Sequence, residues 1–387
     1  MLLYKAVLVW TLSGLIFVNG VIEGAQEKSL DDFCSKNSSS ECICTVIQPK
    51  YIFTCSNDDG SEGQVTIVMK NEIDFLSFEC ENMQSSKTFP DLSEYINESK
   101  ISLKGCTVPI NTSLYDYTSK ISKNILHIEL IVEKDEDKNF NSNYFEGLSD
   151  LKSLILHFEP NIDFNFALEN VFMKLDKLKL LKLYNFPTPN GIFDSLKQLR
   201  VLTIHSYDLK ISSLESGLLK NQRNLTLLRI SGRFINFNIF PNIFANLTEL
   251  QTLELTYNSF NFLPENMLKN NHKMFEFKFL HNDHSIVSLP RKLFANKLNL
   301  EHIELAKNGH EYLPEDLFEN SPNIFLIEIT KNYLSSLPKD IFKDKKYLRL
   351  LDLSSNLLKN LTEGLFDSLS SLVLLFLSHN KLSSLSK

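Results

Sequence analysis

The sequence predicts an α/β-type repeat protein: a solenoid in which short parallel strands form one curved sheet on the concave face, with loops and short helices on the convex face. Three observations predict it. Near the C-terminus a pattern of aliphatic residues and asparagine returns every 24 residues, with its middle aliphatics at Ile327, Leu351 and Leu375. The same register runs back to Leu76 at intervals of 21 to 27 residues. A column of large apolar residues, mostly Phe, keeps the same period. A repeat of this kind indicates stacked units that contact only their neighbours.

The repeat unit is clearest between Ile324 and Asn380. Three successive lines there follow L-x-x-L-x-L-x-x-N-x-L, with Ile at some positions, which is the leucine-rich-repeat signature. The central L-x-L places two aliphatics on the same side of a short strand. The asparagine then turns the chain, and we expect its amide to bond backbone groups in the bend. About 13 strands follow, with middle aliphatics at Leu76, Ile101, Ile128, Leu154, Leu181, Leu202, Leu228, Leu253, Phe277, Ile303, Ile327, Leu351 and Leu375.

Two further columns support this register. Large apolar residues recur once per repeat and are expected to fill the solenoid from its convex side: Phe145, Phe172, Phe193, Leu219, Phe244, Leu268, Phe294, Phe318, Phe342 and Phe366. Asparagine follows each middle aliphatic by five residues in the C-terminal half, at Asn258, Asn282, Asn308, Asn332, Asn356 and Asn380. Upstream this column is lost. We therefore divide the repeats into an irregular part, residues 61–250, and a regular part, residues 251–387.

The first 25 residues are expected to form a secretory signal peptide. Lys5 provides the positive start, residues 6–18 the apolar stretch, and Gly20 and Ala25 the small residues at which cleavage occurs. An uncleaved signal anchor is the alternative, but polar and small residues interrupt it, and no later stretch is long and apolar enough to span a membrane. Six N-x-S/T acceptor sites agree with a secreted, extracellular protein: Asn37, Asn97, Asn111, Asn224, Asn246 and Asn360.

All six cysteines lie in the first third of the chain. An even number behind a signal peptide indicates disulfides, whereas a zinc site would call for a paired C-x2-C spacing that is missing here. Four of them cluster within residues 26–60: Cys34, Cys42, Cys44 and Cys55. We interpret this segment as a cap over the first strand, which otherwise has no neighbour, although spacing alone allows three pairings. Cys80 and Cys106 lie on adjacent predicted strands and are expected to form a bridge.

The cysteine cluster, Cys34-x7-Cys42-Ile43-Cys44-x10-Cys55, resembles the N-terminal cap of extracellular leucine-rich-repeat proteins. The segments 313–318 and 337–342, which read Leu-Pro-Glu-Asp-Leu-Phe and Leu-Pro-Lys-Asp-Ile-Phe, resemble the typical subfamily found in Toll and Toll-like receptor ectodomains. In that family the first cap cysteine pairs with the third and the second with the fourth, which implies the disulfides Cys34–Cys44 and Cys42–Cys55. The family binds protein ligands and pairs through its solenoid surfaces in innate immunity and development. The resemblance therefore implies an extracellular protein ligand or receptor as partner, and it leaves open whether the chain forms a dimer.

Receptors of that family also carry a C-terminal cysteine cap, a membrane span and a cytoplasmic signalling domain, and none of these is found before Lys387. We therefore interpret the chain as a secreted binder or decoy in Toll-type immune signalling. Two alternatives stay open: the ligand-binding ectodomain of an incomplete signalling receptor, and an adhesion or matrix protein. A matrix protein is expected to self-associate, whereas a decoy is expected to stay soluble and to bind one ligand.

Candidate binding residues lie on the concave face, where the residues between the core aliphatics of each strand point. In the C-terminal half this central column carries four carboxylates, Glu254, Glu304, Glu328 and Asp352, against one Lys278. Like charges on neighbouring strands repel, so this column favours a basic partner; ordinary solvation of an open face is the alternative. The adjacent column is apolar and is interpreted as either a contact patch or an uncovered end. It comprises Leu326, Leu350 and Leu374, with Phe376 beside them.

Other functional classes find little support. The net charge of −7 and the lack of a basic run or a phosphate-binding glycine loop disfavour nucleic acid as a partner. No catalytic motif with usable spacing is present, so we expect neither an enzyme nor a cofactor. His281 and His284 have a spacing that could hold a metal, but with Asp283 they lie in a two-residue insertion that is interpreted as a solvated loop.

Overall fold

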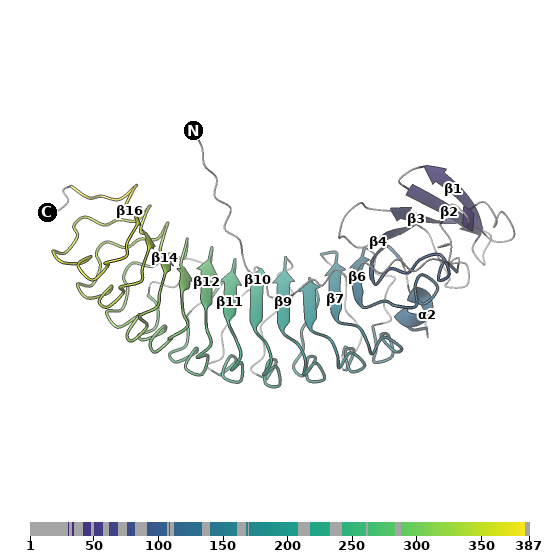
Figure 1. Ribbon diagram of the computed structural model, residues 1–387, viewed down its shortest axis with the longest axis horizontal. Helices are drawn as coiled ribbons and strands as arrows, with labels where there is room; N and C mark the ends of the chain where they lie inside the picture. Colours follow the sequence, from purple (N-terminus) through teal and green to yellow (C-terminus); the bar gives the residue numbers. More distant parts are fainter. Residues whose placement is uncertain are drawn as a thin grey trace, which may run out of the picture.

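The computed structural model is one long curved sheet whose strands follow chain order (Figure 1). It describes residues 30, 33–34, 42–47, 50–56, 62–68, 76–81, 91–106, 108, 112–133, 140–160, 168, 170–207, 217–232, 242–260, 262–282 and 288–383. The predicted signal peptide at residues 1–25 therefore lies outside the described part. Among the described helices, none is long and apolar enough to cross a membrane.

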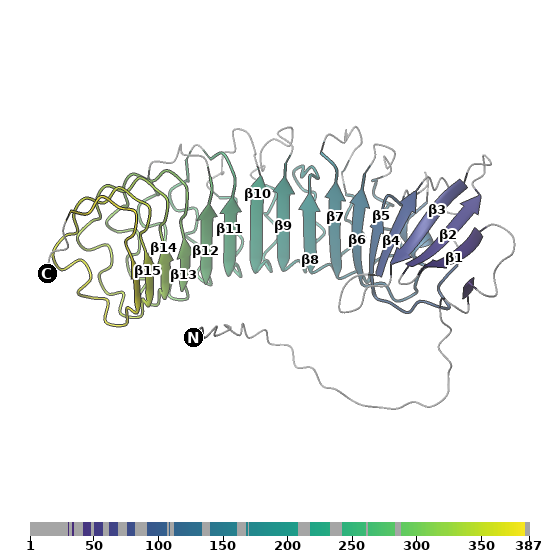
Figure 2. The same cartoon turned by 90° about the horizontal axis from the view of Figure 1, so that it is seen from above.

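Thirteen parallel strands make up the repeat region and lie side by side along the concave face (Figure 2). They are β4 (Leu76–Glu81), β5 (Lys100–Lys104), β6 (His127–Val132), β7 (Ser153–Phe158), β8 (Leu180–Tyr184), β9 (Val201–Ser206), β10 (Leu227–Gly232), β11 (Thr252–Thr256), β12 (Glu276–Leu280), β13 (His302–Glu304), β14 (Leu326–Glu328), β15 (Leu350–Asp352) and β16 (Leu374–Phe376). One short helix, α2 (Leu114–Thr118), starts at a capping box formed by Ser113 and Asp116.

The predicted register is confirmed at every step of this sheet. Each middle aliphatic pairs with the next one, from Leu76 opposite Ile101 to Leu351 opposite Leu375. On β12–β15 the middle aliphatics are buried while the residues on either side remain partly exposed, as the two-residue period of a strand requires; on the last strand, β16, Leu375 is exposed. A slip of one residue would turn the core side chains outward, so burial fixes this register.

The predicted apolar column fills the interior behind the sheet. Its members from Phe145 to Phe342 are fully buried, and Phe366 is half-buried. Neighbouring rings stack, as between Phe294 and Phe318, whose centroids are 5.9 Å apart. The convex-side interior is therefore lined by runs of stacked rings, which Leu219 and Leu268 interrupt.

The asparagine column bonds the backbone of adjacent repeats, as expected from the sequence. The backbone N–H of Asn308 donates to Oδ1 of Asn332 at 3.0 Å, and Nδ2 of Asn332 donates back to the carbonyl oxygen of Leu305 at 2.6 Å. The same pattern joins Asn258 to Asn282 and Asn282 to Asn308. Each buried amide thus links two bends that would otherwise hold unpaired polar groups.

The residue before each of these asparagines has a left-handed backbone conformation. Its φ is 57° at Tyr257 and 54° at Lys331, for example, and 53° at Asn185 in the irregular half. Asn185 combines this turn with the bonding role of the column: its Nδ2 donates to the carbonyl oxygen of Phe158, and its Oδ1 accepts from the N–H of Tyr207. The irregular half therefore satisfies one of its bends with an asparagine displaced by one position.

The cap is a three-stranded antiparallel unit that extends the sheet beyond β4. It comprises β1 (Cys42–Ile47), β2 (Lys50–Ser56) and β3 (Glu62–Val68), and β3 pairs antiparallel with β4. The three disulfides are the expected ones, Cys34–Cys44, Cys42–Cys55 and Cys80–Cys106. The cap therefore covers the first repeat strand by supplying it with a hydrogen-bonded neighbour, and the sheet grows to 16 strands.

Candidate functional site

The strand register brings three of the four predicted carboxylates together. Glu304 on β13 lies opposite Glu328 on β14, which lies opposite Asp352 on β15, and these three residues are here named the acidic triplet. All three lie between buried core positions and face the concave side of the sheet. Neighbouring strands are about 4.8 Å apart, so the carboxylates repel one another across the sheet.

Glu254 is separated from the triplet by a cation. Lys278 lies between Glu254 and Glu304 in the register, and its Nζ is 3.2 Å from Oε1 of Glu304. Glu254 itself accepts from Nε of Arg229 at 2.8 Å. The negative charge that is not balanced within the sheet is therefore concentrated at Glu328 and Asp352.

Glu328 is the member of the acidic triplet whose charged form is disfavoured by its surroundings. Burial raises the pKa of its carboxyl group, and the nearby charges of Glu304 and Asp352 raise the pKa further. Both effects disfavour the charged form, and a cation placed over the triplet would relieve both of them. A basic partner bound over the triplet would therefore stabilise the charged form of Glu328.

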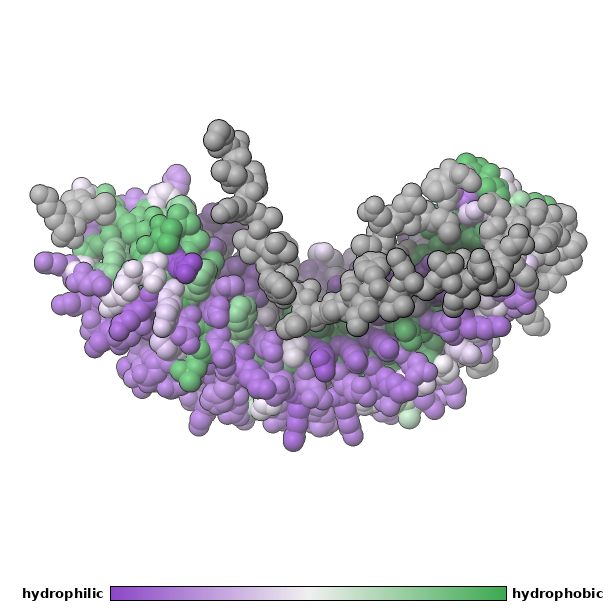
Figure 3. All heavy atoms as spheres, in the orientation of Figure 1, coloured by the Kyte–Doolittle hydropathy of each residue, from purple (hydrophilic) through white to green (hydrophobic). Residues whose placement is uncertain are grey.

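The predicted apolar column lies directly beside the acidic triplet. Leu326, Leu350 and Leu374 occupy successive partner positions on β14, β15 and β16. Leu374 and Phe376 are exposed, and Figure 3 shows hydrophobic residues gathered at this end of the solenoid, whereas the convex face is mostly hydrophilic. The surface thus offers aliphatic contact area next to uncompensated carboxylates.

An aromatic group that the sequence reading missed borders this surface. Phe275 and Phe325, 38% and 37% exposed, lie before β12 and β14 in the row that leads into the strands. The ring of His302 is between them, with centroids 5.0 Å from Phe275 and 6.1 Å from Phe325. The guanidinium carbon of Arg349 is 5.4 Å from the Phe325 centroid, within the range of a cation–π contact. The signal in the sequence is a Phe at the second position before the middle aliphatic.

The predicted glycosylation sites fall into two groups. Asn97, Asn224, Asn246 and Asn360 are exposed, as an acceptor requires. Asn37 and Asn111 lie outside the described residues. All six remain predictions, because exposure permits glycan attachment without demonstrating it.

The metal hypothesis for His281 and His284 gains nothing from the described residues. His281 has φ 55° and stacks on Tyr257 at 4.6 Å, which is a structural role in the turn. Burial lowers the pKa of His281, and Lys307 and Lys331 lower the pKa further, so its imidazole is neutral at pH 7. His284 lies outside the described residues, and within them no cluster of His, Cys, Asp or Glu could hold a metal ion.

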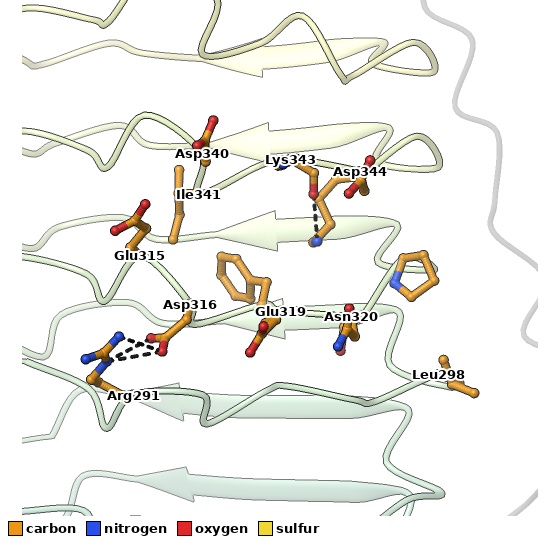
Figure 4. Close-up of a pocket in the computed structure, with 14 residues that line it drawn as sticks. Arg291, Leu298, Glu315, Asp316, Glu319, Asn320, Asp340, Ile341, Lys343 and Asp344 are labelled. Atoms are coloured by element: carbon orange, nitrogen blue, oxygen red, sulfur yellow. Dashed lines mark hydrogen bonds and ion pairs between the residues drawn. The ribbon is translucent and has the colours of Figure 1, made fainter.

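A groove of about 690 Å³ lies between the turn segments of three repeats, residues 291–298, 315–322 and 340–345 (Figure 4). Its charged residues bond one another: Nη2 of Arg291 is 3.0 Å from Oδ2 of Asp316. Lys345 is buried, burial lowers the pKa of its amine, and its Nζ donates to the carbonyl oxygen of Lys343. These groups are engaged in holding the turns together, and we assign the groove no ligand.

Comparison with known proteins supports the fold. Residues 322–382 match the family model described as leucine rich repeat. The structure is similar to a chain of the Drosophila Toll–Spatzle complex, with 23% identity and a TM-score of 0.67, covering 90% of this chain and 49% of that one. A glycosylated form of the same complex gives 18% identity and a TM-score of 0.58, covering 92% of this chain and 53% of that one.

A plant peptide hormone receptor, RGFR1 in complex with RGF2, is a third similar structure. It gives 16% identity and a TM-score of 0.51, covering 85% of this chain and 52% of that one. The chain thus spans about half the length of the structures it matches. A search of curated protein sequences finds no match. The fold is therefore a leucine-rich-repeat solenoid similar to Toll and to receptor ectodomains that were solved with ligands.

Proposed function

We propose that the protein is a secreted leucine-rich-repeat binder of an extracellular protein, acting as a soluble binder or decoy in Toll-type innate immune signalling. The observation that carries the proposal is the acidic triplet beside the apolar column. Glu328 and Asp352 form none of the ion pairs found among the described residues, with Lys278 acting on Glu328 only as a nearby charge, and Leu326 and Leu350 offer aliphatic surface next to them. A protein segment with lysine or arginine beside apolar side chains complements both features.

The aromatic group gives this surface an anchor at its edge. Phe275 and Phe325 provide large rigid contact area, and aromatic and arginine side chains are the residues that dominate the binding energy of protein interfaces. Arg349 lies over Phe325 and would pair with an acidic group of the partner at the periphery of the contact. The four described acceptor asparagines are not among the residues of this surface.

Direct titration tests the proposal, with Spatzle as the first ligand because the structure is similar to a chain of a Toll–Spatzle complex. The triple variant Glu304→Lys, Glu328→Lys and Asp352→Lys should weaken binding at least tenfold and flatten its dependence on salt, since it reverses the attractive charge. A matched control reverses three exposed carboxylates in the turns: Glu315, Asp340 and Glu363. Equal affinity of the triplet variant and the control would refute the concave site.

The second candidate is the ligand-binding ectodomain of a Toll-like signalling receptor, which the coverage of about half of the Toll chain favours. The C-terminal peptide of the native protein, identified by mass spectrometry in soluble and membrane fractions, separates the two. A soluble chain ending at Lys387 supports the decoy, and a membrane-bound chain that continues past Lys387 supports the receptor. Sedimentation analysis tests the matrix alternative, which requires self-association.

A further inference from the structure

The row of residues that leads into the strands changes its chemistry along the solenoid. Backbone hydrogen bonds join this row from repeat to repeat: the N–H of Lys179 donates to the carbonyl oxygen of Lys152 at 2.9 Å, and that of Arg200 donates to Lys179 at 2.8 Å. The same ladder continues through Thr226 and Gln251 to Phe275. The row is therefore cationic beside β7–β9 and uncharged beside β10 and β11, and from β12 onward it is mixed: Phe275, Glu301, Phe325, Arg349 and Val373.

Five consecutive strands contribute a basic group to the cationic part. Lys100 on β5 lies opposite His127 on β6, and His127 lies opposite Ser153, which directly follows Lys152. Lys179 and Arg200 continue the row of Lys152 to β9, whereas Lys100 and His127 stand one position later in their repeats, beside Ser99 and Leu126 of the row. These five residues, Lys100, His127, Lys152, Lys179 and Arg200, are here named the basic rim. Four steps of about 4.8 Å give it a length of about 19 Å.

Three cations of the basic rim are exposed and Lys100 is partly exposed, and the only carboxylate that the charge of Lys152 is seen to affect among the described residues is Asp150, whose pKa it lowers. Lys152, Lys179 and Arg200 are exposed, and none of the ion pairs formed by the described residues includes them. The nearest carboxylate of the preceding row, Asp150, is held by Nζ of Lys177 at 2.6 Å. Residues 174–200 carry six Lys or Arg against two Asp, in a chain whose net charge is −7. The basic rim is thus a local excess that the whole-chain charge conceals.

The positive charge of the basic rim affects the imidazole of His127. His127 is partly buried, which lowers the pKa of its imidazole, and the charges of Lys100 and Lys152 lower the pKa further. His127 is therefore neutral at pH 7, and the rim's positive charge comes from its lysines and arginine. An anion bound along the row would stabilise these cations without competing with a carboxylate of the protein.

We propose that the basic rim binds a linear sulfated polysaccharide. Such a chain carries anionic groups at regular intervals along an extended backbone, and the four cations of the basic rim, spread along one edge of β5–β9, offer it a series of binding positions. The rim has no aromatic side chain on which bases could stack, so it fits a single-stranded nucleic acid less well. Exposed flexible lysines also suit sulfate groups, which they contact as point charges. This site lies apart from the acidic triplet and does not depend on the function proposed for that surface.

The test is titration of the full chain with size-defined heparin oligosaccharides, after enzymatic removal of N-glycans because Asn97 and Asn224 flank the rim. The variant Lys152→Ala, Lys179→Ala and Arg200→Ala should bind at least tenfold more weakly, and its slope of log affinity against log salt should fall by about 2 to 3. The matched control, Lys269→Ala, Lys339→Ala and Lys346→Ala, removes the same charge from exposed positions elsewhere and should bind like the wild type.

Three outcomes would overturn the proposal. Equal losses in the rim variant and the control would show bulk attraction alone. Lack of binding by the wild type at physiological salt would remove the site. Tighter binding of single-stranded DNA or polyglutamate of equal charge would assign the rim to a different class of partner. Unchanged thermal unfolding of the rim variant, together with retained binding by Lys152→Arg and Lys179→Arg, would show that lost charge causes the effect.

Discussion

Replacing Asn332 by alanine should destabilise the solenoid far more than its small change in volume suggests. Asn332 is 3% exposed, and its amide makes four hydrogen bonds. Oδ1 accepts from the N–H groups of Asn308 and His310, at 3.0 and 3.2 Å. Nδ2 donates to the carbonyl oxygens of Leu305 and Thr330, at 2.6 and 3.0 Å. The substitution thus deprives groups in two bends of their partner.

The magnitude follows from the two N–H groups that lose their acceptor. Each buried donor left without a partner costs about 1–3 kcal/mol, so we expect Asn332→Ala to lower the free energy of unfolding by about 2–6 kcal/mol. Urea unfolding followed by far-UV circular dichroism measures it, with the slope checked because repeat arrays can lose cooperativity.

Asn323→Ala is the matched control for this prediction. Asn323 is exposed, and its Nδ2 makes one hydrogen bond, to the carbonyl oxygen of Leu298. Water can replace that bond, so the control should cost about 1 kcal/mol or less. Similar losses from the two substitutions would refute the claim that the buried column holds the bends together.

Two further predictions address charge and covalent linkage. Because the pKa of Glu328 is raised in the folded state, its charge destabilises the fold above that pKa; Glu328→Gln should therefore unfold at a higher temperature than the wild type at pH 7, and the difference should disappear as the pH falls below the pKa of Glu328. A lower melting temperature of the variant at pH 7 would contradict this. Replacing Cys80 and Cys106 by serine opens the link between β4 and β5 and should cost about 2–4 kcal/mol and reduce the secreted yield. A normal yield of monodisperse variant would count against a stabilising role of this disulfide.

The register of the sheet could be predicted because the spacing of the aliphatic residues also determines which side chains are buried. A single aliphatic per repeat, such as Leu154 or Leu202, identifies a strand even where no asparagine follows it, since its burial leaves one alignment of the strands. The role of Asn185 could not be predicted, because the spacing of the repeats does not point to it. Asn185 stands one position before the place of the asparagine column in its repeat. Only the left-handed turn at Asn185 shows that its amide bonds the bend of the adjacent repeat, as the amides of the column do.

The candidate site was predictable in position and less so in charge. The spacing of the repeats predicted that Glu304, Glu328 and Asp352 lie together. Which carboxylates keep an unbalanced charge, however, depends on where the long side chains of Arg229 and Lys278 reach. The antiparallel strands of the cap carry no repeat, so the cysteine spacing indicated a stapled module without indicating that it continues the sheet. Phe275 and Phe325 stand two positions before a middle aliphatic, a position that is also exposed at Lys152, Lys179 and Arg200, so their exposure follows from the column they occupy.

The stacked phenylalanines act as wedges that set the curvature of the molecule. Ring centroids on the convex side are 5.9 Å apart for Phe145 and Phe172 and 6.3 Å apart for Phe342 and Phe366, whereas the strands are about 4.8 Å apart. Each repeat is thus wider at its back than at its front, and the difference accumulates from β4 to β16. The distance between the basic rim and the acidic triplet is therefore set by side chains that touch neither surface. A change in the size of a buried ring would change how well a large partner fits across the arc.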